Sequence, residues 1–265
     1  LVATPIGNLG DLSPRAREVL SSVDFIAAED TRVTQKLLTA CSLPRKPLIS
    51  YYEHNRRARG EEVLAKLLAG ESCALVTDAG TPAVSDPGED LVALCAARDV
   101  PVIPIPGCCA AVCALAASGL PTGRWCFEGF LSVNKKARRE HLDALAGEKR
   151  TMIFYEAPHK LCATLRDLAE AFGGERRISL SRELTKLHEE TLRFTLSEAV
   201  QYFDQTPPRG EFVLIVEGAP ETPDTPEDAD ARLQAAADEV RRRIAQGETQ
   251  KDAVKAVSAE AGVKK

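Results

Sequence analysis

Residues 73–88 read Cys-Ala-Leu-Val-Thr-Asp-Ala-Gly-Thr-Pro-Ala-Val-Ser-Asp-Pro-Gly. The segment Cys73–Thr77 is a short apolar run, which is typical of a buried strand. The segment Thr77–Gly88 follows directly and consists almost entirely of turn formers, small residues and two aspartates. Ligands of open α/β sheets bind at the carboxyl ends of the strands. We therefore expect this loop to surround a ligand with its backbone N–H and C=O groups, while its carboxylates accept hydrogen bonds.

Apolar strands and helical patterns alternate on both sides of this loop. We expect further buried strands at Val23–Ala28 and Val100–Ile105, and helices at Glu61–Ala69 and Glu89–Ala97, where apolar residues recur at helical spacing. The pair Ser13-Pro14 marks a helix start, with a capping hydroxyl and a proline in the first turn. The alternation predicts an α/β fold with a mainly parallel sheet.

The alternation resumes after Leu120-Pro-Thr-Gly123, which we take as a domain boundary. Beyond it we expect strands at Trp125–Glu128, Thr151–Tyr155, Arg176–Leu180, Thr191–Thr195 and Glu211–Glu217, and helices near Lys135–Leu145 and His159–Ala171. The close spacing of the last strands predicts antiparallel pairing. Residues Ala219–Asp230 are rich in Pro, Glu, Asp and Thr and predict a linker, and two helical patterns follow at Ala231–Gln246 and Thr249–Ala261.

These patterns predict two α/β domains and a small helical C-terminal tail. The expected divisions are residues 1–121, 122–220 and 221–265. A length of 265 residues agrees with two domains of ordinary size better than with one core. The chain begins at Leu1 without Met, within a segment that has the character of a strand, so we expect residues to precede it.

Composition limits the functions that the chain can have. The formal net charge is −5, which excludes attraction of RNA to the whole surface and leaves local basic patches to bind it. The candidate patches are Arg56, Arg57 and Arg59; Lys135, Lys136, Arg138 and Arg139; Arg241–Arg243; and Lys264 and Lys265. No apolar run has the length of a membrane span and no signal peptide is visible, so we expect a cytoplasmic protein.

The eight cysteines and four histidines show no ligand spacing. No C-x-x-C pair occurs, and Cys108, Cys109 and Cys113 lie in an Ala-rich segment, where we expect them to be buried as small apolar side chains. We therefore expect no metal site.

Two more loops resemble ligand loops. Thr4–Gly10 contains Gly and Pro, which permit close approach to the backbone, although ordinary turns look alike. Pro104–Ala111 leads into a helix start with small side chains, which fits either a ligand or a close helix–sheet contact. The chain has no G-x-x-x-x-G-K-[ST] sequence and no G-x-G-x-x-G sequence at a strand end, which disfavours ATP and NAD.

Several motifs in order resemble one enzyme family. They are Thr4-Pro-Ile-Gly-Asn-Leu9, Ala28-Glu-Asp-Thr-Arg32, Asp78-Ala-Gly-Thr-Pro82, Ser85-Asp-Pro-Gly88, Pro106-Gly107, Phe127-Glu-Gly-Phe-Leu131, Phe154-Tyr-Glu-Ala-Pro-His159, Arg182-Glu-Leu-Thr-Lys186 and Glu211-Phe-Val-Leu-Ile-Val-Glu-Gly218. Together they resemble the ribosomal RNA small-subunit methyltransferase I family, which has the tetrapyrrole-methylase fold, a class III methyltransferase fold. The resemblance covers residues 1 to 218.

The resemblance implies an S-adenosylmethionine-dependent enzyme that methylates the 2′-oxygen of a cytidine in the decoding region of 16S rRNA, within the 30S subunit, and that forms a homodimer. It implies cofactor contacts from Pro5, Asp78, Ala79, Gly80, Thr81, Cys109, Ala110, Tyr155, Leu184 and Glu211. Where relatives often have Pro-Gly-Pro, this chain has Pro106-Gly107-Cys108. The tail stops at Lys265, where relatives continue for another helix.

Methyl transfer from a sulfonium requires alignment of the acceptor oxygen and a group that takes its proton. Charged side chains at the predicted strand ends are our candidates: Glu29, Asp30, Glu156, Glu183, and Lys186 with a depressed pKa, with Arg32 and Arg182 as partners for phosphate or carboxylate. The base itself stays open among them. Two other functions also stay open: methylation of a tetrapyrrole by the same fold, and RNA binding without catalysis.

Overall fold

A computed structural model describes residues 1–220 and 226–261. The chain forms two compact units, Leu1–Ala219 and Pro220–Lys265. Within the described ranges, no helix has both the length and the apolar character of a membrane span.

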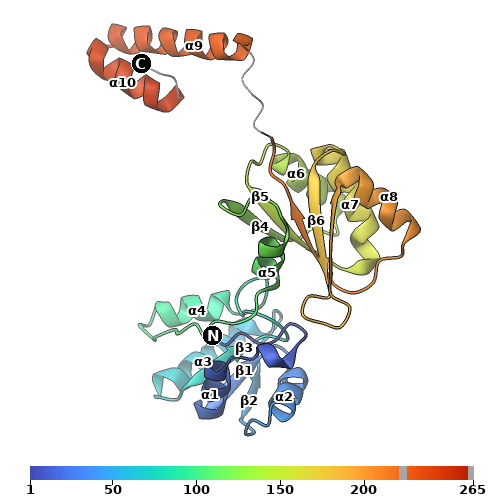
Figure 1. Cartoon of the computed structure of the whole chain (residues 1–265). Helices are drawn as coiled ribbons and strands as arrows, with labels where there is room; N and C mark the ends of the chain where they lie inside the picture. Colours follow the sequence, from blue (N-terminus) through green and yellow to red (C-terminus); the bar gives the residue numbers. More distant parts are fainter. Residues whose placement is uncertain (221–225, 262–265) are drawn as a thin grey trace. The chain divides into compact units, whose positions relative to one another are not determined.

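The first sheet of the larger unit has three parallel strands in the order β2-β1-β3 (Figure 1). The strands are β1 (Phe25–Ala28), β2 (Leu48–Ser50) and β3 (Cys73–Val76). Helices α1 (Pro14–Ser22) and α2 (Thr31–Ala40) contribute to the apolar cluster on one face, and α3 (Arg56–Leu68) and α4 (Glu89–Ala96) to that on the other. The side chain of Ser13 accepts the N–H of Ala16, which confirms the predicted start of α1.

The expected strand at Val100–Ile105 is wrong. Only Ile105 pairs, through an isolated bridge to Val2, and Ile103 is 59% exposed. The segment contains Pro101 and Pro104, which have no N–H for a strand ladder. Leu48–Ser50 does form a strand that the sequence pattern did not predict, since three residues are too few for a periodic signal.

The second sheet has five strands in the order β4-β5-β8-β6-β7. They are β4 (Trp125–Phe130), β5 (Thr151–Glu156), β6 (Arg177–Arg182), β7 (Glu190–Thr195) and β8 (Phe212–Val216). The pair β4–β5 is parallel and the other three pairs are antiparallel, as expected for the last strands. The helices are α5 (Ala110–Ala117), α6 (Lys135–Leu145), α7 (Pro158–Phe172) and α8 (Leu196–Gln205).

Alternation along β5 gives the second sheet two apolar faces. Met152 and Phe154 pack into the cluster that includes α7 and α8, whereas Ile153 packs with Ala111 and Ala114 of α5. Figure 1 shows α5 beside β5, at the point where the chain passes from the first sheet to the second. The start of α5 therefore brings the third predicted loop to the second sheet.

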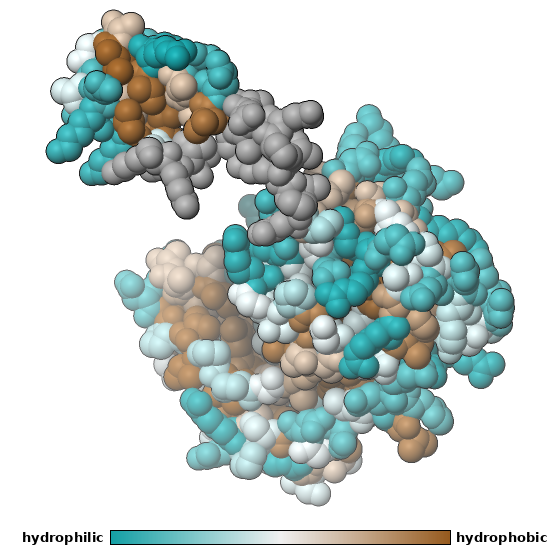
Figure 2. Space-filling model, turned by 45° about the horizontal axis from the view of Figure 1, so that its top comes forward, coloured by the Kyte–Doolittle hydropathy of each residue, from teal (hydrophilic) through white to brown (hydrophobic). Residues whose placement is uncertain are grey.

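The smaller unit consists of α9 (Pro226–Ala245) and α10 (Gln250–Ala261). Ala236, Ala253 and Val257 are buried, while Leu233 and Ile244 are exposed. Figure 2 shows apolar side chains gathered on one face of this helix pair. The predicted linker Ala219–Asp230 was too long, because α9 already begins at Pro226. Residues 221–225 and the basic pair Lys264 and Lys265 lie outside the described residues. The expected division at residue 121 falls between the two sheets but inside one compact unit, and it stays a prediction.

Candidate active site

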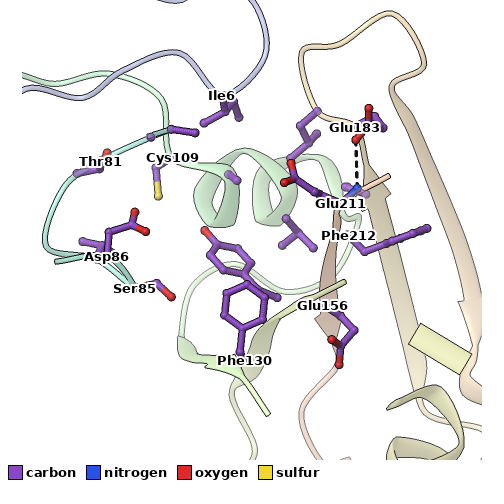
Figure 3. Close-up of a pocket in the computed structure, with 18 of the residues that line it drawn as sticks. Ile6, Thr81, Ser85, Asp86, Cys109, Phe130, Glu156, Glu183, Glu211 and Phe212 are labelled. Carbon is purple, nitrogen blue, oxygen red and sulfur yellow. Dashed lines mark hydrogen bonds between the residues drawn. The ribbon is translucent and has the colours of Figure 1, made fainter. Parts of the chain in front are cut away.

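A cavity of about 300 Å³ lies between loops that belong to the two sheets. The loop after β3 contributes Ala79, Gly80, Thr81, Val84, Ser85 and Asp86; the start of α5 contributes Cys109 and Ala110; the end of β5 and the residue after it contribute Tyr155, Glu156 and Ala157; and the segments around β6 and β8 contribute Ser181, Glu183, Leu184, Lys186, Glu211, Phe212 and Val213, together with Ile6 and Phe130. Figure 3 shows these groups facing one another across the cavity.

Hydrogen bonds join the three predicted ligand loops. The N–H of Thr4 donates to Gly80 O at 2.9 Å, and the N–H of Gly80 donates to Thr4 O at 3.1 Å. The hydroxyl of Thr81 donates to Cys108 O at 2.8 Å. Gly80 has a φ of +88°, a conformation that L side chains rarely adopt, which explains a glycine in the middle of the second loop. The loops therefore form one wall of the cavity as a unit.

Strained backbone is concentrated on two sides of the cavity. Four residues other than glycine have left-handed φ there: Ala83 at 64°, Ser85 at 65°, Glu183 at 51° and Thr185 at 66°. Such conformations cost on the order of 1–3 kcal/mol each and persist only where the surrounding structure enforces them. They occur in the loop after β3 and in the loop after β6, which are the two loops that face each other.

Aromatic rings form the floor of the cavity. The Tyr155 ring makes edge contacts with Phe127 at 5.1 Å and Phe130 at 5.5 Å between centroids. The Tyr155 hydroxyl accepts the N–H of Ala111 at 3.2 Å, and burial raises the pKa of Tyr155 to about 12. The hydroxyl thus keeps its proton at neutral pH. A floor of this kind suits a flat ring with polar edges.

A lysine and two glutamates lie on the opposite side. Lys186 Nζ contacts Glu183 Oε1 and Glu211 Oε2, each at 3.0 Å. The backbone N–H of Glu211 and the ammonium of Lys186 both donate hydrogen bonds to the Glu183 carboxylate, and these bonds lower the pKa of Glu183. Burial lowers the pKa of Lys186, but its hydrogen bonds to the two glutamates outweigh that effect and raise it. The depressed pKa that we expected for a lysine base is therefore absent, and Lys186 stays protonated.

Close approach of two loops fixes the position of Lys186. A Cβ added to Gly7 would lie 2.5 Å from Lys186 Cγ and 2.8 Å from Thr185 Oγ1, so the first loop has no room for a side chain there. The loop Thr4–Gly10 thus contacts the loop after β6, which contains Thr185 and Lys186.

Carboxyl groups gather where β1 and β3 end. The N–H of Asp78 donates to Glu29 Oε2 at 3.3 Å, and the N–H of Asp30 donates to Asp78 Oδ1 at 3.1 Å. Burial, followed by repulsion from Glu29 and Asp78, raises the pKa of Asp86 to about 6. Burial is also the main cause that raises the pKa of Glu29 and of Asp78. Hydrogen bonds from Arg32 instead lower the pKa of Asp30 to about 2.

The structure brings most of the expected cofactor residues together. Ala79, Gly80, Thr81, Cys109, Ala110, Tyr155, Leu184 and Glu211 line the cavity. Pro5 and Asp78 do not, and they line a neighbouring hollow that includes Thr4 and Gly7. Their assignment as cofactor contacts stays a prediction, and the connection of Asp78 to the cavity is its repulsion of the Asp86 carboxylate.

The expected catalytic side chains are distributed over several places. Glu156 and Lys186 line the cavity, whereas Glu29 lines a second cavity beside it and Arg32 lies in a separate shallow depression. Asp30 caps α2 and pairs with Arg32 at 2.6 Å.

Glu156 is only 4% exposed, and both of its oxygens are engaged, by the N–H of Ala157 at 2.9 Å and by the hydroxyl of Thr164. These bonds hold the start of α7, so the arrangement favours a structural role for Glu156.

The sequence pattern does not single out Asp86 as a site residue, although Asp86 lies in the predicted ligand loop Thr77–Gly88. The signal that identifies it is burial next to two other carboxyl groups, which a sequence does not display. The reading of the cysteines also needs correction: Cys113 is exposed and Cys108 and Cys109 are only half-buried, because α5 is short and covers the sheet with one side. In the part of the chain that the structure describes, no three His, Cys, Asp or Glu side chains gather in a way that could hold a metal ion.

Known proteins resemble this chain over most of its length. The family of tetrapyrrole (corrin/porphyrin) methylases matches residues 1–200. The chain is 52% identical to ribosomal RNA small subunit methyltransferase I of Synechocystis sp., over 98% of this chain and 91% of that protein. It is 48% identical to the protein of the same name from Halalkalibacterium halodurans, over 100% of this chain and 91% of that one.

A solved structure has the same fold. It is a uroporphyrin-III C-methyl transferase from Thermus thermophilus complexed with S-adenyl homocysteine, with a TM-score of 0.54 and 17% identity, over 82% of this chain and 95% of that one. At this level of identity the likeness shows the fold alone.

Proposed function

Since this chain belongs to the tetrapyrrole (corrin/porphyrin) methylase family, and within it to the ribosomal RNA small subunit methyltransferase I family, we propose that it methylates the 2′-oxygen of a cytidine in the decoding region of 16S rRNA. The observation that carries the proposal is 52% identity to a protein of that name over 98% of the chain. Likeness over almost the whole length includes the loops around the cavity as well as the scaffold.

The cofactor is S-adenosylmethionine, which supplies an electrophilic methyl group on a sulfonium. The cavity fits this molecule by its chemistry. The floor around Tyr155 and Phe130 suits the adenine ring, and the carboxylates of Glu183 and Glu211 suit the ammonium and hydroxyl groups. A volume of about 300 Å³ is at the lower end of the range for small-molecule sites.

The chain's own task is to align the acceptor oxygen and to receive its proton. Alignment in a fixed geometry supplies up to about 7–11 kcal/mol in ideal cases, and a positioned base adds about 10²–10⁴-fold. Neither contribution needs a metal or a covalent intermediate on the protein.

RNA binding must come from local charge, because the net charge is −5. Many of the candidate arginines are already paired: Arg56 contacts Glu53 and Asp90, and Arg59 contacts Glu62. Arg57 is exposed and, among the residues described, has no ion-pair partner. It lies in the first turn of α3, close to Tyr52 and His54 in the sequence, and is the basic side chain that we assign to the RNA backbone.

The other basic patches are largely neutralised as well. Arg138 contacts Asp167 at 2.5 Å, Arg139 contacts Glu170 at 2.8 Å, and Arg242 contacts Glu239 at 2.7 Å. Each pair places a carboxylate beside the arginine, which leaves little net positive charge to attract RNA.

Methyl transfer can be measured directly. The full chain is incubated with S-adenosylmethionine carrying a labelled methyl group and with unmodified 30S subunits, free 16S rRNA or a tetrapyrrole. The proposal predicts label in RNA at one cytidine, at a bond that becomes resistant to alkaline cleavage, and more label in 30S subunits than in free RNA. Label in the base, in the tetrapyrrole or in no acceptor would contradict it.

We also propose a cytoplasmic homodimer, the arrangement that the family resemblance implies. Light scattering of the full chain tests the dimer, for which a mass of about twice 28.6 kDa is expected and a mass of one chain would refute it.

A further inference from the structure

A second cavity, of about 540 Å³, lies on the other side of the loop after β3. Its lining includes Glu29, Tyr52, His54 and Glu89, together with Ser85 and Asp86. Ser85 and Asp86 also line the cofactor cavity. In Figure 3 the side chains of both residues extend from this loop toward the cofactor cavity. The two cavities therefore meet at Ser85 and Asp86, of which Ser85 has a left-handed φ of 65°.

We propose that the second cavity receives the ribose of the acceptor nucleotide and that Asp86 accepts the proton of its reacting hydroxyl. The inference rests on the ribose methylation proposed above and assigns the substrate site and the base for it. The ribose oxygen forms its new bond to the methyl carbon, the carbon–sulfur bond breaks with its electron pair left on sulfur, and the hydroxyl proton passes to the Asp86 carboxylate.

The surroundings of Asp86 suit a base. The groups that face it are Glu29 from the end of β1, Asp78 from its own loop and Tyr155 from β5, while Glu53, His54 and Glu89 line the rest of the second cavity. Burial and the two carboxylates raise the pKa of Asp86 to about 6. A base is most effective when its pKa lies close to the working pH. Asp86 is thus mostly ionised at neutral pH and still basic enough to hold a proton.

Two other candidates fit this role less well. Glu29 lines the second cavity but not the cofactor cavity, and one of its oxygens already accepts the N–H of Asp78. Lys186 lines the cofactor cavity on the opposite side and stays protonated because its hydrogen bonds to Glu183 and Glu211 raise its pKa. Only Asp86 combines contact with both cavities and a carboxylate that titrates near neutral pH, among the charged groups of the described site.

The rim of the second cavity suits a nucleotide. Tyr52 is 42% exposed, and its ring makes an edge contact with His54 at 6.2 Å between centroids. Exposed aromatic side chains stack unpaired bases, which is the usual way in which proteins hold single-stranded RNA. Arg57 follows in the first turn of α3 and is exposed to a phosphate. Tyr52 thus suits the base, the second cavity suits the ribose, and Arg57 suits the phosphate.

The first test is Asp86→Asn, studied by single-turnover methyl transfer to 30S subunits at saturating S-adenosylmethionine. We expect the rate at pH 7.5 to fall by about 10²–10⁴-fold. The wild-type rate should rise with pH through an apparent pKa near 6, which gives the pH–rate profile an acidic limb. The residual rate of the variant should lack this acidic limb. Glu61→Gln, an exposed carboxyl change on α3 outside both cavities, should keep the rate and the limb. Calorimetry with S-adenosylmethionine checks that each variant is folded.

The second test is Glu29→Gln, which keeps Asp86 but removes a neighbouring negative charge. Because Glu29 raises the pKa of Asp86, its loss should move the acidic limb of the wild-type profile to lower pH. An unmoved limb in this variant, or an Asp86→Asn rate within threefold of wild type, would overturn the assignment. If the wild type itself transfers no methyl group to RNA, the proposed function fails and this inference fails with it. If the wild type is active but Asp86→Asn keeps a rate within threefold of wild type, or the Glu29→Gln profile does not move, only the present inference fails.

Discussion

Replacing Asp86 by asparagine is expected to stabilise the folded chain at neutral pH. Burial and repulsion from Glu29 and Asp78 raise the pKa of this carboxyl from its ordinary 3.8 to about 6. A carboxyl with a raised pKa in the folded state contributes stability that is complete below pH 3.8 and is lost as the pH rises through 6. The whole difference corresponds to about 3 kcal/mol. Solvent screens this half-buried group, so we expect about 1 kcal/mol.

Thermal unfolding of the two chains between pH 4 and 8 measures this effect. The variant should melt about 2–4 °C above the wild type at pH 7.5, and the gap should narrow as the pH falls from 6 to 4. Asp30→Asn is the matched control with the opposite sign, because Arg32 lowers the pKa of Asp30 to about 2 and its loss should not stabilise. A variant that melts at or below the wild-type temperature at pH 7.5, or a gap that does not depend on pH, would contradict a raised pKa of Asp86 in the folded chain.

Three further changes test other parts of the molecule. Gly7→Ala places a Cβ 2.5 Å from Lys186 Cγ and should weaken S-adenosylmethionine binding about tenfold in calorimetry. The control Gly147→Ala adds a Cβ with no atom within 4 Å and should leave the binding unchanged. Arg57→Glu should weaken binding to 30S subunits and reduce the salt dependence of binding by about one to two phosphate contacts, without a change in cofactor affinity; an unaltered salt slope would dismiss this contact. Phe154→Ala removes a fully buried ring from the larger core and should lower the free energy of unfolding by about 3–5 kcal/mol in urea titrations.

The fold was predictable where local signals were strong. The helix at Lys135–Leu145 has the predicted bounds, because Asn134 caps its start and Leu142 and Leu145 pack on the core near its end. The segment Val100–Ile105 has apolar residues like a strand, but prolines and exposure prevent a ladder. The helix Leu196–Gln205 escaped notice although Thr195 and Glu198 form a capping box, because its pattern directly follows a strand. Local sequence patterns thus identified most helices and strands, whereas pairing with distant segments decided whether an ambiguous apolar segment formed a strand.

The candidate site was predictable as a set of loops but not as a set of roles. Turn formers at strand ends marked the loop around Gly80, and the structure joins it to Thr4 and Cys108 by hydrogen bonds. Roles depend on what lies opposite each side chain. Lys186 meets two glutamates that raise its pKa, and Asp86 meets two carboxyl groups that raise its own. These neighbours are distant in the sequence, so no local pattern contains them.

We place the methyl donor in the cavity between the loops, with its methyl group facing Asp86 and the second cavity. A crystal structure of the full chain with S-adenosylmethionine tests this placement most directly. We expect the adenine ring near Tyr155 and the methyl carbon on the side of the cavity that Ser85 and Asp86 form. A donor bound with its methyl group toward Lys186 and Glu211, or bound outside this cavity, would contradict it.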